Sequence, residues 1–460
     1  MRRTKKFLIN GSILTITNVV MRSISMTFGL YTSNKIGTEA VGVLSLIMSV
    51  YLLAITLATS GLNLACTTLV SKEFSKNNFT NGLKVVKDSS LFALSLGLIS
   101  SVIVVIFSNL ISQNWLNDMV SSFPLYLIAA GLPFIAISSV LNGYFFAARK
   151  AYKGAVAQFL EITIKIIITI ILLNLYSLKN VEGICICLIL ADVISEIFSC
   201  SLLIILYKFD RFKYKKIGLP NNSYKKDILK ITFPVSITSY IRSGLSTLKD
   251  LMVPKMLVYY GLPYAIALSE YGRVTGMALP IIMFPNMCMS SFSNLLVPEF
   301  SSLLANGNKK RIVTVCNKIF KIASFFAIIV SCILICFSNE ISYMIFNNLE
   351  CSDIIKMLSP LILFICLDNI IDNMLKGLNK QFEVMMYNVV DLAITIILLC
   401  FLIPVLGING FIISIYISEL FNFLVSYYQL RKITGFKIDV IHSIFKPVIL
   451  CLIVYILIYI

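Results

Sequence analysis

The sequence predicts an all-α protein that crosses a membrane many times. Hydrophobic residues make up 58% of the 460-residue chain and charged residues only 13%, whereas about a quarter of the residues in a soluble domain are charged. The mean hydropathy is +0.90. Apolar runs long enough to span a bilayer follow one another, and none alternates like a barrel strand. Only helices satisfy their own backbone hydrogen bonds in lipid over such lengths, so these runs are predicted transmembrane helices.

Twelve long apolar segments, followed by a shorter thirteenth, are the predicted helices. Connectors containing Gly, Pro, Asn or charged residues separate them. The segments are 8–33, 40–70, 88–111, 120–147, 155–177, 183–207, 228–260, 265–300, 312–338, 354–378, 384–404, 408–430 and 441–460. The eighth carries five helix breakers, so we expect it to be bent: Gly272, Gly276, Pro280, Pro285 and Pro298.

The charge distribution predicts the orientation and argues against nucleic acid as a partner. The formal net charge is +17, but the Lys and Arg residues lie in alternate connectors, as the positive-inside rule describes. With the amino terminus in the cytoplasm, the connectors at 109–123 and 337–353 are outside, and neither contains Lys or Arg. The opening residues MRRTKK run directly into the first span, which we expect to act as its own anchor.

A basic linker at 209–227 divides the helices into two sets of six, and the two sets repeat each other. The matching pieces are RS at 22–23 and 242–243, EFS at 73–75 and 299–301, Lys150 with Glu161 and Lys380 with Asp391, and ISEIF at 194–198 and ISELF at 417–421. They run in the same order, at offsets from 220 (242 − 22) to 230 (380 − 150). Ordered matches of this kind indicate an internal duplication.

The duplication predicts the domain organisation. Because six is an even number, both halves enter the membrane from the same side, so the repeat is parallel. The predicted parts are an N-terminal six-helix lobe at 1–208, a cytoplasmic linker at 209–227, a C-terminal six-helix lobe at 228–432 and an extra helix at 433–460. We expect the two lobes to face each other across a central cavity and to alternate its access.

Charged residues inside the first and seventh helices predict a site for an anion. Arg22 and Arg242 lie at corresponding depths, and a charge at the centre of a spanning helix costs about 2.5–3.5 kcal/mol. Arginine grips phosphate in a bidentate fork and stays charged in any environment. The candidate substrate-binding residues are therefore Arg22, Arg242, Lys249 and Asp250, for a group such as a lipid pyrophosphate. The alternative is an intramembrane ion pair with Asp250 that fixes helix packing.

Carboxylates inside the sixth and tenth helices are the candidate coupling or gating residues. Asp192 and Glu196 are one turn apart in the sixth helix, and Asp368 and Asp372 are one turn apart in the tenth. Carboxylates stacked in this way can carry protons or bind a cation. They can equally be counter-ions for the arginines.

The remaining reactive residues favour structural roles, and no enzyme is predicted. Glu161 and Lys165, spaced i,i+4 with Glu first, are expected to neutralise each other on the fifth helix. The twelve Cys residues lie mostly in apolar segments and are interpreted as small buried residues. The only histidine is His442, so a nucleophile–histidine–acid set is not expected, and no GxxxxGK[ST] loop is present. We expect no cofactor and no metal site.

Motifs in both halves resemble a family of membrane exporters. The most specific run is ALSEYGRVTGMALP at 267–280, followed by Phe284-Pro285 and LVPEFS at 296–301. VPK at 253–255 and NGYF at 142–145 support it. Along its whole length the sequence resembles the multidrug/oligosaccharidyl-lipid/polysaccharide (MOP) exporter superfamily. Within it, the sequence is most similar to the polysaccharide-transporter branch and its stage V sporulation protein B-like group.

The resemblance implies a flippase of undecaprenyl-linked saccharide or peptidoglycan precursor, acting in spore cortex or cell-envelope biogenesis in a bacterial cell membrane. It implies a lipid-linked saccharide and membrane lipid as partners, with cell-wall synthesis proteins as further candidates. Relatives bind the lipid precursor with cationic residues of a central cavity, and Arg22 lies in the corresponding region. Lys165 stands where the family pattern has arginine, and one extra helix at 433–460 stands where close relatives tend to have two. A cation-coupled multidrug or metabolite antiporter of the same superfamily and a membrane scaffold for cell-wall synthases remain alternatives.

Overall fold

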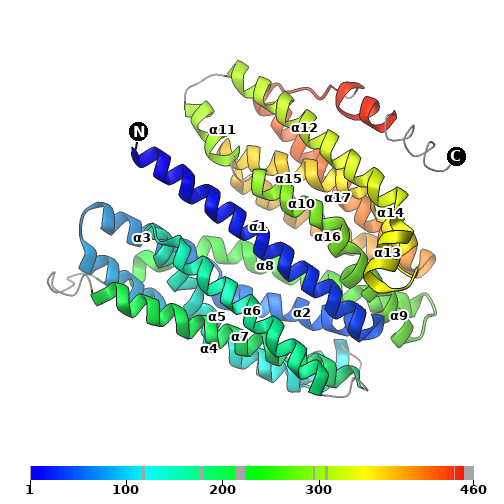
Figure 1. The fold of residues 1–460 in the computed structure, drawn as a ribbon, viewed down its shortest axis with the longest axis horizontal. Coiled ribbons are helices and arrows are strands. Elements are labelled where there is room, and N and C mark those ends of the chain that lie inside the picture. Colours follow the sequence, from blue (N-terminus) through cyan, green and yellow to red (C-terminus); the bar gives the residue numbers. More distant parts are fainter. Residues whose placement is uncertain are drawn as a thin grey trace. The chain divides into compact units, whose positions relative to one another are not determined.

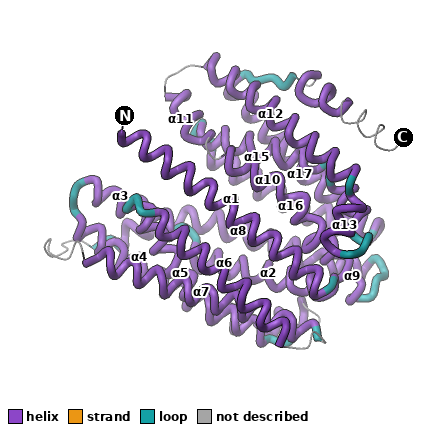
Figure 2. The backbone as a smooth tube through the Cα atoms, in the orientation of Figure 1, coloured by secondary structure: helices purple, strands orange, loops and turns teal. Residues whose placement is uncertain are grey.

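A computed structural model shows that the chain is helical, with no strand in the part that it describes (Figure 2). The described residues are 2–115, 120–175, 180–212, 223–293, 296–305, 309–439 and 441–449, and only the backbone is described for 2–16, 18, 212, 309, 442 and 444. The helices are α1 (Arg2–Ile36), α2 (Thr38–Thr59), α3 (Leu62–Ser75), α4 (Phe79–Trp115), α5 (Phe123–Ala147), α6 (Ala151–Leu175), α7 (Val181–Phe212), α8 (Lys225–Tyr259), α9 (Tyr264–Gly272), η1 (Arg273–Ala278), α10 (Leu279–Ser293), α11 (Leu296–Ala305), α12 (Lys309–Cys336), α13 (Ser338–Phe346), α14 (Ser352–Leu358), α15 (Leu361–Gly377), α16 (Gln381–Leu406), α17 (Ile408–Thr434) and η2 (Ile441–Phe445) (Figure 1). The predicted all-α class is confirmed.

The described helices include nine that are long and apolar enough to cross a membrane. A tenth is added if α14 and α15, bent by 46° at the break between them, form one span. The helices α1 and α8, which carry Arg22 and Arg242, are not among the nine, because polar and charged residues interrupt their apolar runs. The multi-pass prediction is confirmed, and the count of twelve crossings stays a prediction.

Three predicted segments are divided in the structure. Segment 40–70 is split into α2 and α3 at Gly61, whose φ of 73° lies in the left-handed region that glycine tolerates. Segment 354–378 is split into α14 and α15. Segment 265–300, the one rich in helix breakers, contains the π-helical turn η1 between α9 and α10. Helix breakers were therefore a better guide to irregular backbone than to the ends of helices.

Contacts between residues divide the chain into two compact units. Unit 1 comprises Met1–Met21 and Val43–Thr247, and unit 2 comprises Arg22–Gly42 and Leu248–Ile460. The three boundaries fall inside α1, α2 and α8, rather than at the linker. The lobes predicted at 1–208 and 228–432 stay a prediction. Residues 213–222 of the linker, and residues 440 and 450–460 of the extra segment at 433–460, lie outside the described residues.

Unit 1 is packed around α5. This helix contacts α3, α4, α6 and α7, and 61% of its apolar window is buried, against 22% for α4 and 17% for α6 (Figure 1). Close packing depends on glycine at Gly143, where an added Cβ would lie 2.8 Å from the carbonyl oxygen of Asn63 on α3. Thr67 of α3 donates a hydrogen bond to the Gly143 carbonyl oxygen over 3.1 Å. Helix α5 is therefore the core of this unit.

Unit 2 is packed around α15 in the same way. This helix contacts α10, α11, α12, α16 and α17, and most of its residues are buried. At its end, a Cβ on Gly377 would lie 2.7 Å from the carbonyl oxygen of Val297 on α11. Helices α5 and α15 correspond in the predicted duplication, since they are each followed by the repeated lysine, Lys150 or Lys380.

The turns that follow α5 and α15 repeat each other bond for bond. Arg149 has φ 60° and Asn379 has φ 61°, the left-handed conformation common at helix ends. The paired backbone hydrogen bonds are Ala148 N to Tyr144 O (2.8 Å) and Leu378 N to Met374 O (3.0 Å), Arg149 N to Phe146 O (3.1 Å) and Asn379 N to Lys376 O (3.2 Å), and Lys150 N to Phe145 O (2.8 Å) and Lys380 N to Leu375 O (2.9 Å). Every pair is offset by 230 (380 − 150), which fixes the register of the repeat from α5 to α6 and from α15 to α16.

Candidate functional site

The two arginines predicted to bind an anion are exposed side chains on α1 and α8. Arg22 begins the part of α1 that belongs to unit 2, and Arg242 lies in the part of α8 that belongs to unit 1. Within the described part of the chain neither arginine has an ion-pair partner. An uncompensated guanidinium on an apolar helix requires water or an anionic ligand, because lipid cannot solvate it. A common anion site formed by both arginines stays a prediction.

Lys249 and Asp250, the other two candidate substrate-binding residues, form an ion pair with each other. Their Nζ and Oδ1 atoms are 3.5 Å apart, and both side chains are about a quarter exposed or less, at 28% and 21%. Lys249 also lies within electrostatic range of Asp391 and Glu419. The structure thus groups Lys249 with carboxylates of unit 2, and a role in substrate binding stays a prediction.

In unit 1 the structure brings the predicted coupling residues Asp192 and Glu196 of α7 together with Glu161 and Lys165 of α6. Lys165 Nζ forms an ion pair with Asp192 Oδ1. The carboxyl group of Glu161 lies within hydrogen-bonding range of Glu196 and of the Ser199 hydroxyl. We call Glu161, Lys165, Asp192 and Glu196 the unit 1 acidic cluster.

The expected pair between Glu161 and Lys165 is therefore not the main ion pair. Helical spacing places Lys165 on the same face as Glu161, but α7 packs against α6 and presents Asp192 to that face. Asp192 is 11% exposed and Lys165 37%. Asp192 is mostly buried, and the lysine offsets part of the cost of its charge, because a buried charge gains most from a partner.

In unit 2 the predicted coupling residues Asp368 and Asp372 are both 9% exposed on α15. Ser426 of α17 donates a hydrogen bond to Asp372 Oδ1 over 3.0 Å. Asp368 Oδ1 has no hydrogen-bond partner among the described residues. Buried carboxylate oxygens with few donors around them are costly, so this is a place where a proton or a cation would be stabilising.

Two further carboxylates of unit 2 lie beside this pair. Asp391 of α16 is 8% exposed and accepts a hydrogen bond from Ser418 over 2.7 Å. Glu419 of α17 lies within electrostatic range of Asp372 and Asp391. We call Asp368, Asp372, Asp391, Glu419 and Lys249 the unit 2 acidic cluster.

The two clusters contain corresponding residues of the duplication. Glu161 and Asp391 are both the eleventh residue after the repeated lysine, and Glu196 and Glu419 occupy the repeated ISE sequence. From the sequence, Asp391 and Glu419 were recognised only as markers of the repeat and were not predicted as site residues. The signal was present, because a carboxylate retained at both copies of an apolar helix needs a reason beyond chance.

Chemically, these clusters suit cations and the arginines suit anions. Among the described residues, no group of three or more His, Cys, Asp or Glu side chains has the arrangement of a metal site. Each cluster instead combines carboxylates with one lysine, which lowers the cost of keeping negative charge among apolar helices. The candidate site residues are thus of two kinds, carboxylates grouped with a lysine and separate exposed arginines.

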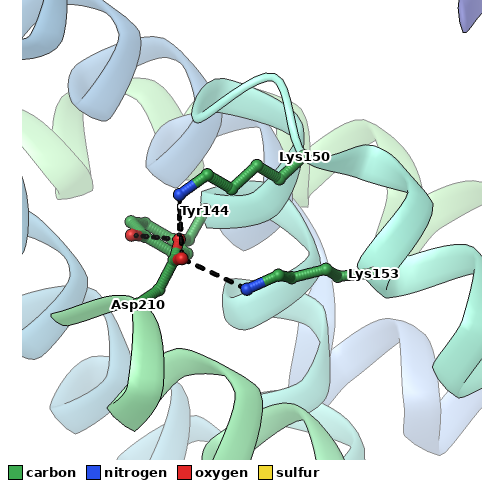
Figure 3. A network of polar contacts seen from close by, with 4 residues as sticks. All are labelled: Tyr144, Lys150, Lys153 and Asp210. Carbon is green, nitrogen blue, oxygen red and sulfur yellow. Dashed lines mark hydrogen bonds and ion pairs between the residues drawn. The ribbon is translucent and has the colours of Figure 1, made fainter. Parts of the chain in front are cut away.

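A third polar network lies where α5, α6 and α7 meet (Figure 3). Asp210 is 2% exposed and accepts hydrogen bonds from Lys150 Nζ over 2.8 and 2.7 Å, from Lys153 Nζ over 3.1 Å and from the Tyr144 hydroxyl over 3.2 Å. The Tyr144 ring packs edge-on against Tyr207, with centroids 5.0 Å apart. This network fastens the repeated turn to the end of α7. Sequence analysis missed it, although Asp210 is the one acidic residue in a run of basic ones.

The chain matches known families and relatives over most of its length. Residues 7–304 match the family model described as polysaccharide biosynthesis protein, and residues 268–402 match the MatE model. Stage V sporulation protein B of Bacillus subtilis (strain 168) is 24% identical over 421 residues, which cover 89% of this chain and 80% of that protein. Sporulation protein YkvU of the same organism is 20% identical over 241 residues, 51% of this chain and 53% of that protein.

Solved structures share the fold. A multidrug resistance MATE family transporter of the MOP superfamily in its inward-facing conformation aligns with a TM-score of 0.72 at 16% identity, over 92% of this chain and 98% of that one. The outward-facing conformation of such a transporter gives 0.64 at 17% identity, over 93% and 95%. The family matches and the similarity to stage V sporulation protein B, together with this fold, define a multi-pass membrane transporter of the MOP superfamily. Within that class, the chain belongs to the polysaccharide biosynthesis protein family.

Proposed function

We propose that this chain is a flippase that moves an undecaprenyl-linked saccharide, such as a peptidoglycan precursor, across a bacterial cell membrane. The observation that carries the proposal is the family match over residues 7–304. The similarity to stage V sporulation protein B favours a role in the spore cortex or cell envelope. Its partners are the lipid-linked saccharide and membrane lipid, with cell-wall synthesis proteins as candidates, and its amino terminus is cytoplasmic.

The charges support an anionic substrate. Arg22 and Arg242 occupy corresponding positions of the duplication, and both are exposed and without an ion-pair partner among the described residues. A diphosphate offers each guanidinium a bidentate partner. The flippase proposal assigns these arginines to the diphosphate and the acidic clusters to coupling, by alternating access of the two lobes.

A cation-coupled multidrug or metabolite antiporter is the second candidate. It is favoured by the fold shared with multidrug MATE transporters and by the two acidic clusters. For a cationic substrate, the carboxylates rather than the arginines would bind the cargo. The two candidates differ in which charged group a substitution must disable to stop transport.

The test uses the purified protein in vesicles that carry a fluorescent undecaprenyl-diphosphate saccharide in both leaflets. A membrane-impermeant quencher reports the rate at which the lipid changes sides. We expect Arg22→Gln and Arg242→Gln each to weaken the apparent affinity about tenfold or more, because each removes a charge-assisted contact. Arg149→Gln, which changes an exposed arginine of the α5–α6 turn, is the matched control and leaves the rate unchanged.

Two outcomes would contradict the proposal. Normal lipid movement in both Arg22→Gln and Arg242→Gln would remove the anion site. An absence of lipid movement, together with uptake of a cationic dye driven by a sodium or proton gradient, would favour the antiporter.

A further inference from the structure

Lys165 is a positive charge built into the unit 1 acidic cluster. It lies on α6 one turn after Glu161, and its Nζ is paired with Asp192 of α7. Glu196 lies beside Glu161, within hydrogen-bonding range of its carboxyl group. Asp192 contacts the ammonium group, and Glu161 and Glu196 lie within electrostatic range of it. All four residues are in helices long and apolar enough to span a membrane.

This arrangement needs a cation. Carboxylates among apolar helices cannot all stay ionised without positive charge close by, since neither lipid nor packed side chains solvate them. Transporters can meet this need with an exchangeable ion, and the oxygen atoms of Glu161, Asp192, Glu196 and Ser199 are ligands that a small monovalent cation accepts. In this protein the ammonium group of Lys165, which is covalently part of α6, is already paired with Asp192.

In the duplication, both clusters contain a lysine, but the lysine comes from a different helix in each unit. Glu161 and Glu196 correspond to Asp391 and Glu419, but Lys165 corresponds to Thr395, at the same offset of 230 (395 − 165). Thr395 is 4% exposed, and its hydroxyl donates to the Asp391 carbonyl oxygen over 2.8 Å. In unit 2 the lysine comes instead from α8, as Lys249, within electrostatic range of Asp391 and Glu419.

We propose that Lys165 is a resident cation, whose ammonium group takes the place between Glu161, Asp192 and Glu196 that a free monovalent cation would otherwise fill. Unit 1 then requires no exchangeable ion, and ion dependence of transport arises outside this cluster. Removing the ammonium opens a site that Na⁺ or methylammonium can enter. This inference concerns ion binding and holds whichever substrate the protein carries.

The experiment compares the full-length wild-type protein with Lys165→Ala, purified in detergent, by the temperature of thermal unfolding. Each is measured in sodium, methylammonium and choline chloride at equal ionic strength, with choline as the cation too large to enter. We expect the unfolding temperature of Lys165→Ala to be about 2–4 °C higher in sodium or methylammonium than in choline, after the same difference for the wild type is subtracted. The reason is that a ligand that binds only the folded state stabilises it. Measuring unfolding rather than lipid movement keeps this test separate from that of the flippase proposal.

Two controls keep the result specific. Lys165→Arg retains a charge and should respond like the wild type. Lys87→Ala removes an exposed lysine of α4, outside the cluster, and should also respond like the wild type. If Lys165→Ala cannot be purified folded, Lys165→Gln, which also removes the ammonium charge but keeps a polar side chain, is measured instead. A cation response equal to that of the wild type in the variant measured overturns the proposal.

Discussion

At the scale of single residues, Asp210 is a carboxylate with three hydrogen-bonding partner residues. It is almost completely buried and holds Lys150, Lys153 and Tyr144 together (Figure 3). We expect Asp210→Asn to lower the free energy of unfolding by about 2–4 kcal/mol, because the two lysines lose their charged acceptor in a poorly solvated place. Thermal or denaturant unfolding of the purified protein measures the change.

The duplication provides a matched control for Asp210. Lys380 corresponds to Lys150, but its partner is Glu383, 2.6 Å away and 30% exposed. Glu383→Gln should change stability little, because water solvates both members of an exposed pair and competes with their attraction. Equal destabilisation by Asp210→Asn and Glu383→Gln would show that burial is not what makes the Asp210 network strong.

The residue scale also shows what sequence could not predict. Helical spacing correctly placed Glu161 and Lys165 on one face, and Asp192 and Glu196 on one face of the next helix. It could not tell how α6 and α7 turn toward each other, because their rotation is set by packing of apolar side chains that look alike in sequence. The ion pair between Lys165 and Asp192 depends on that rotation. Pairing across helices is therefore the part of the site that required the structure.

At the scale of elements, the π-helical turn η1 is held to the segment before α14. Arg273 opens the turn and pairs with Glu270 at 3.1 Å and with Glu350 at 3.4 Å. Met277 follows Arg273 by four residues, and its sulfur atom lies 3.6 Å from the sulfur atom of the buried Cys351. A π-helical turn has wider hydrogen-bonded rings than an α-helix and is often found at functional sites. These contacts fix the connection between η1 and α14.

Cys351 allows this connection to be tested through its reactivity. Burial raises the pKa of the Cys351 thiol to about 11, with Glu350 and Glu270 adding to the rise and Arg273 opposing it. The thiolate reacts, so a raised pKa means slow alkylation at neutral pH and a rate that rises about tenfold per pH unit until the pKa is approached. In a variant whose single cysteine is Cys351, maleimide labelling should follow this course.

The neighbouring position supplies the comparison. Glu350 is exposed, so Glu350→Cys in a background with Cys351→Ser presents a thiol of ordinary pKa, about 8.5. At pH ~7 it should react a few hundred times faster than Cys351, from the difference in thiolate fraction alone. A Cys351 rate that levels off near pH 9 would mean that this segment is open in solution.

The elements themselves were largely predictable, and their irregularities less so. Long apolar runs predicted helix in every segment that the structure describes, because lipid leaves few alternatives for an uninterrupted apolar chain. Gly61 ends one helix and begins another through a left-handed residue, which sequence alone does not distinguish from a tolerated glycine. The run at 272–280 predicted irregular backbone, but its form as a π-helical turn depends on what Arg273 and Met277 contact.

At the scale of the whole molecule, the linker is fastened to unit 1 at both of its described ends. Asp210, near the end of α7, accepts hydrogen bonds from Tyr144, Lys150 and Lys153. Asp88 of α4, 3% exposed, accepts a hydrogen bond from the Tyr224 backbone N–H over 3.2 Å, just before α8. The first part of α8 follows, with Ser236 donating to the Ser60 carbonyl oxygen over 3.0 Å and Thr247 donating to that of Ser49 over 3.0 Å. This explains why α8 as far as Thr247 belongs to unit 1 by its contacts, although the sequence predicts it as the start of the second lobe.

The distribution of charge along the whole chain makes one further prediction, its orientation in the membrane. Lys and Arg residues in short connectors stay in the cytoplasm during insertion, whereas Asp and Glu have little influence. Lys310 lies at the start of α12, and Glu340 lies in α13, just after the other end of α12. Both residues are exposed, and α12 is apolar and long enough to span. In a cysteine-free background, Glu340→Cys should react with a membrane-impermeant maleimide added to intact cells. Lys310→Cys should react only after the cells are opened, and the reverse pattern would place the amino terminus outside.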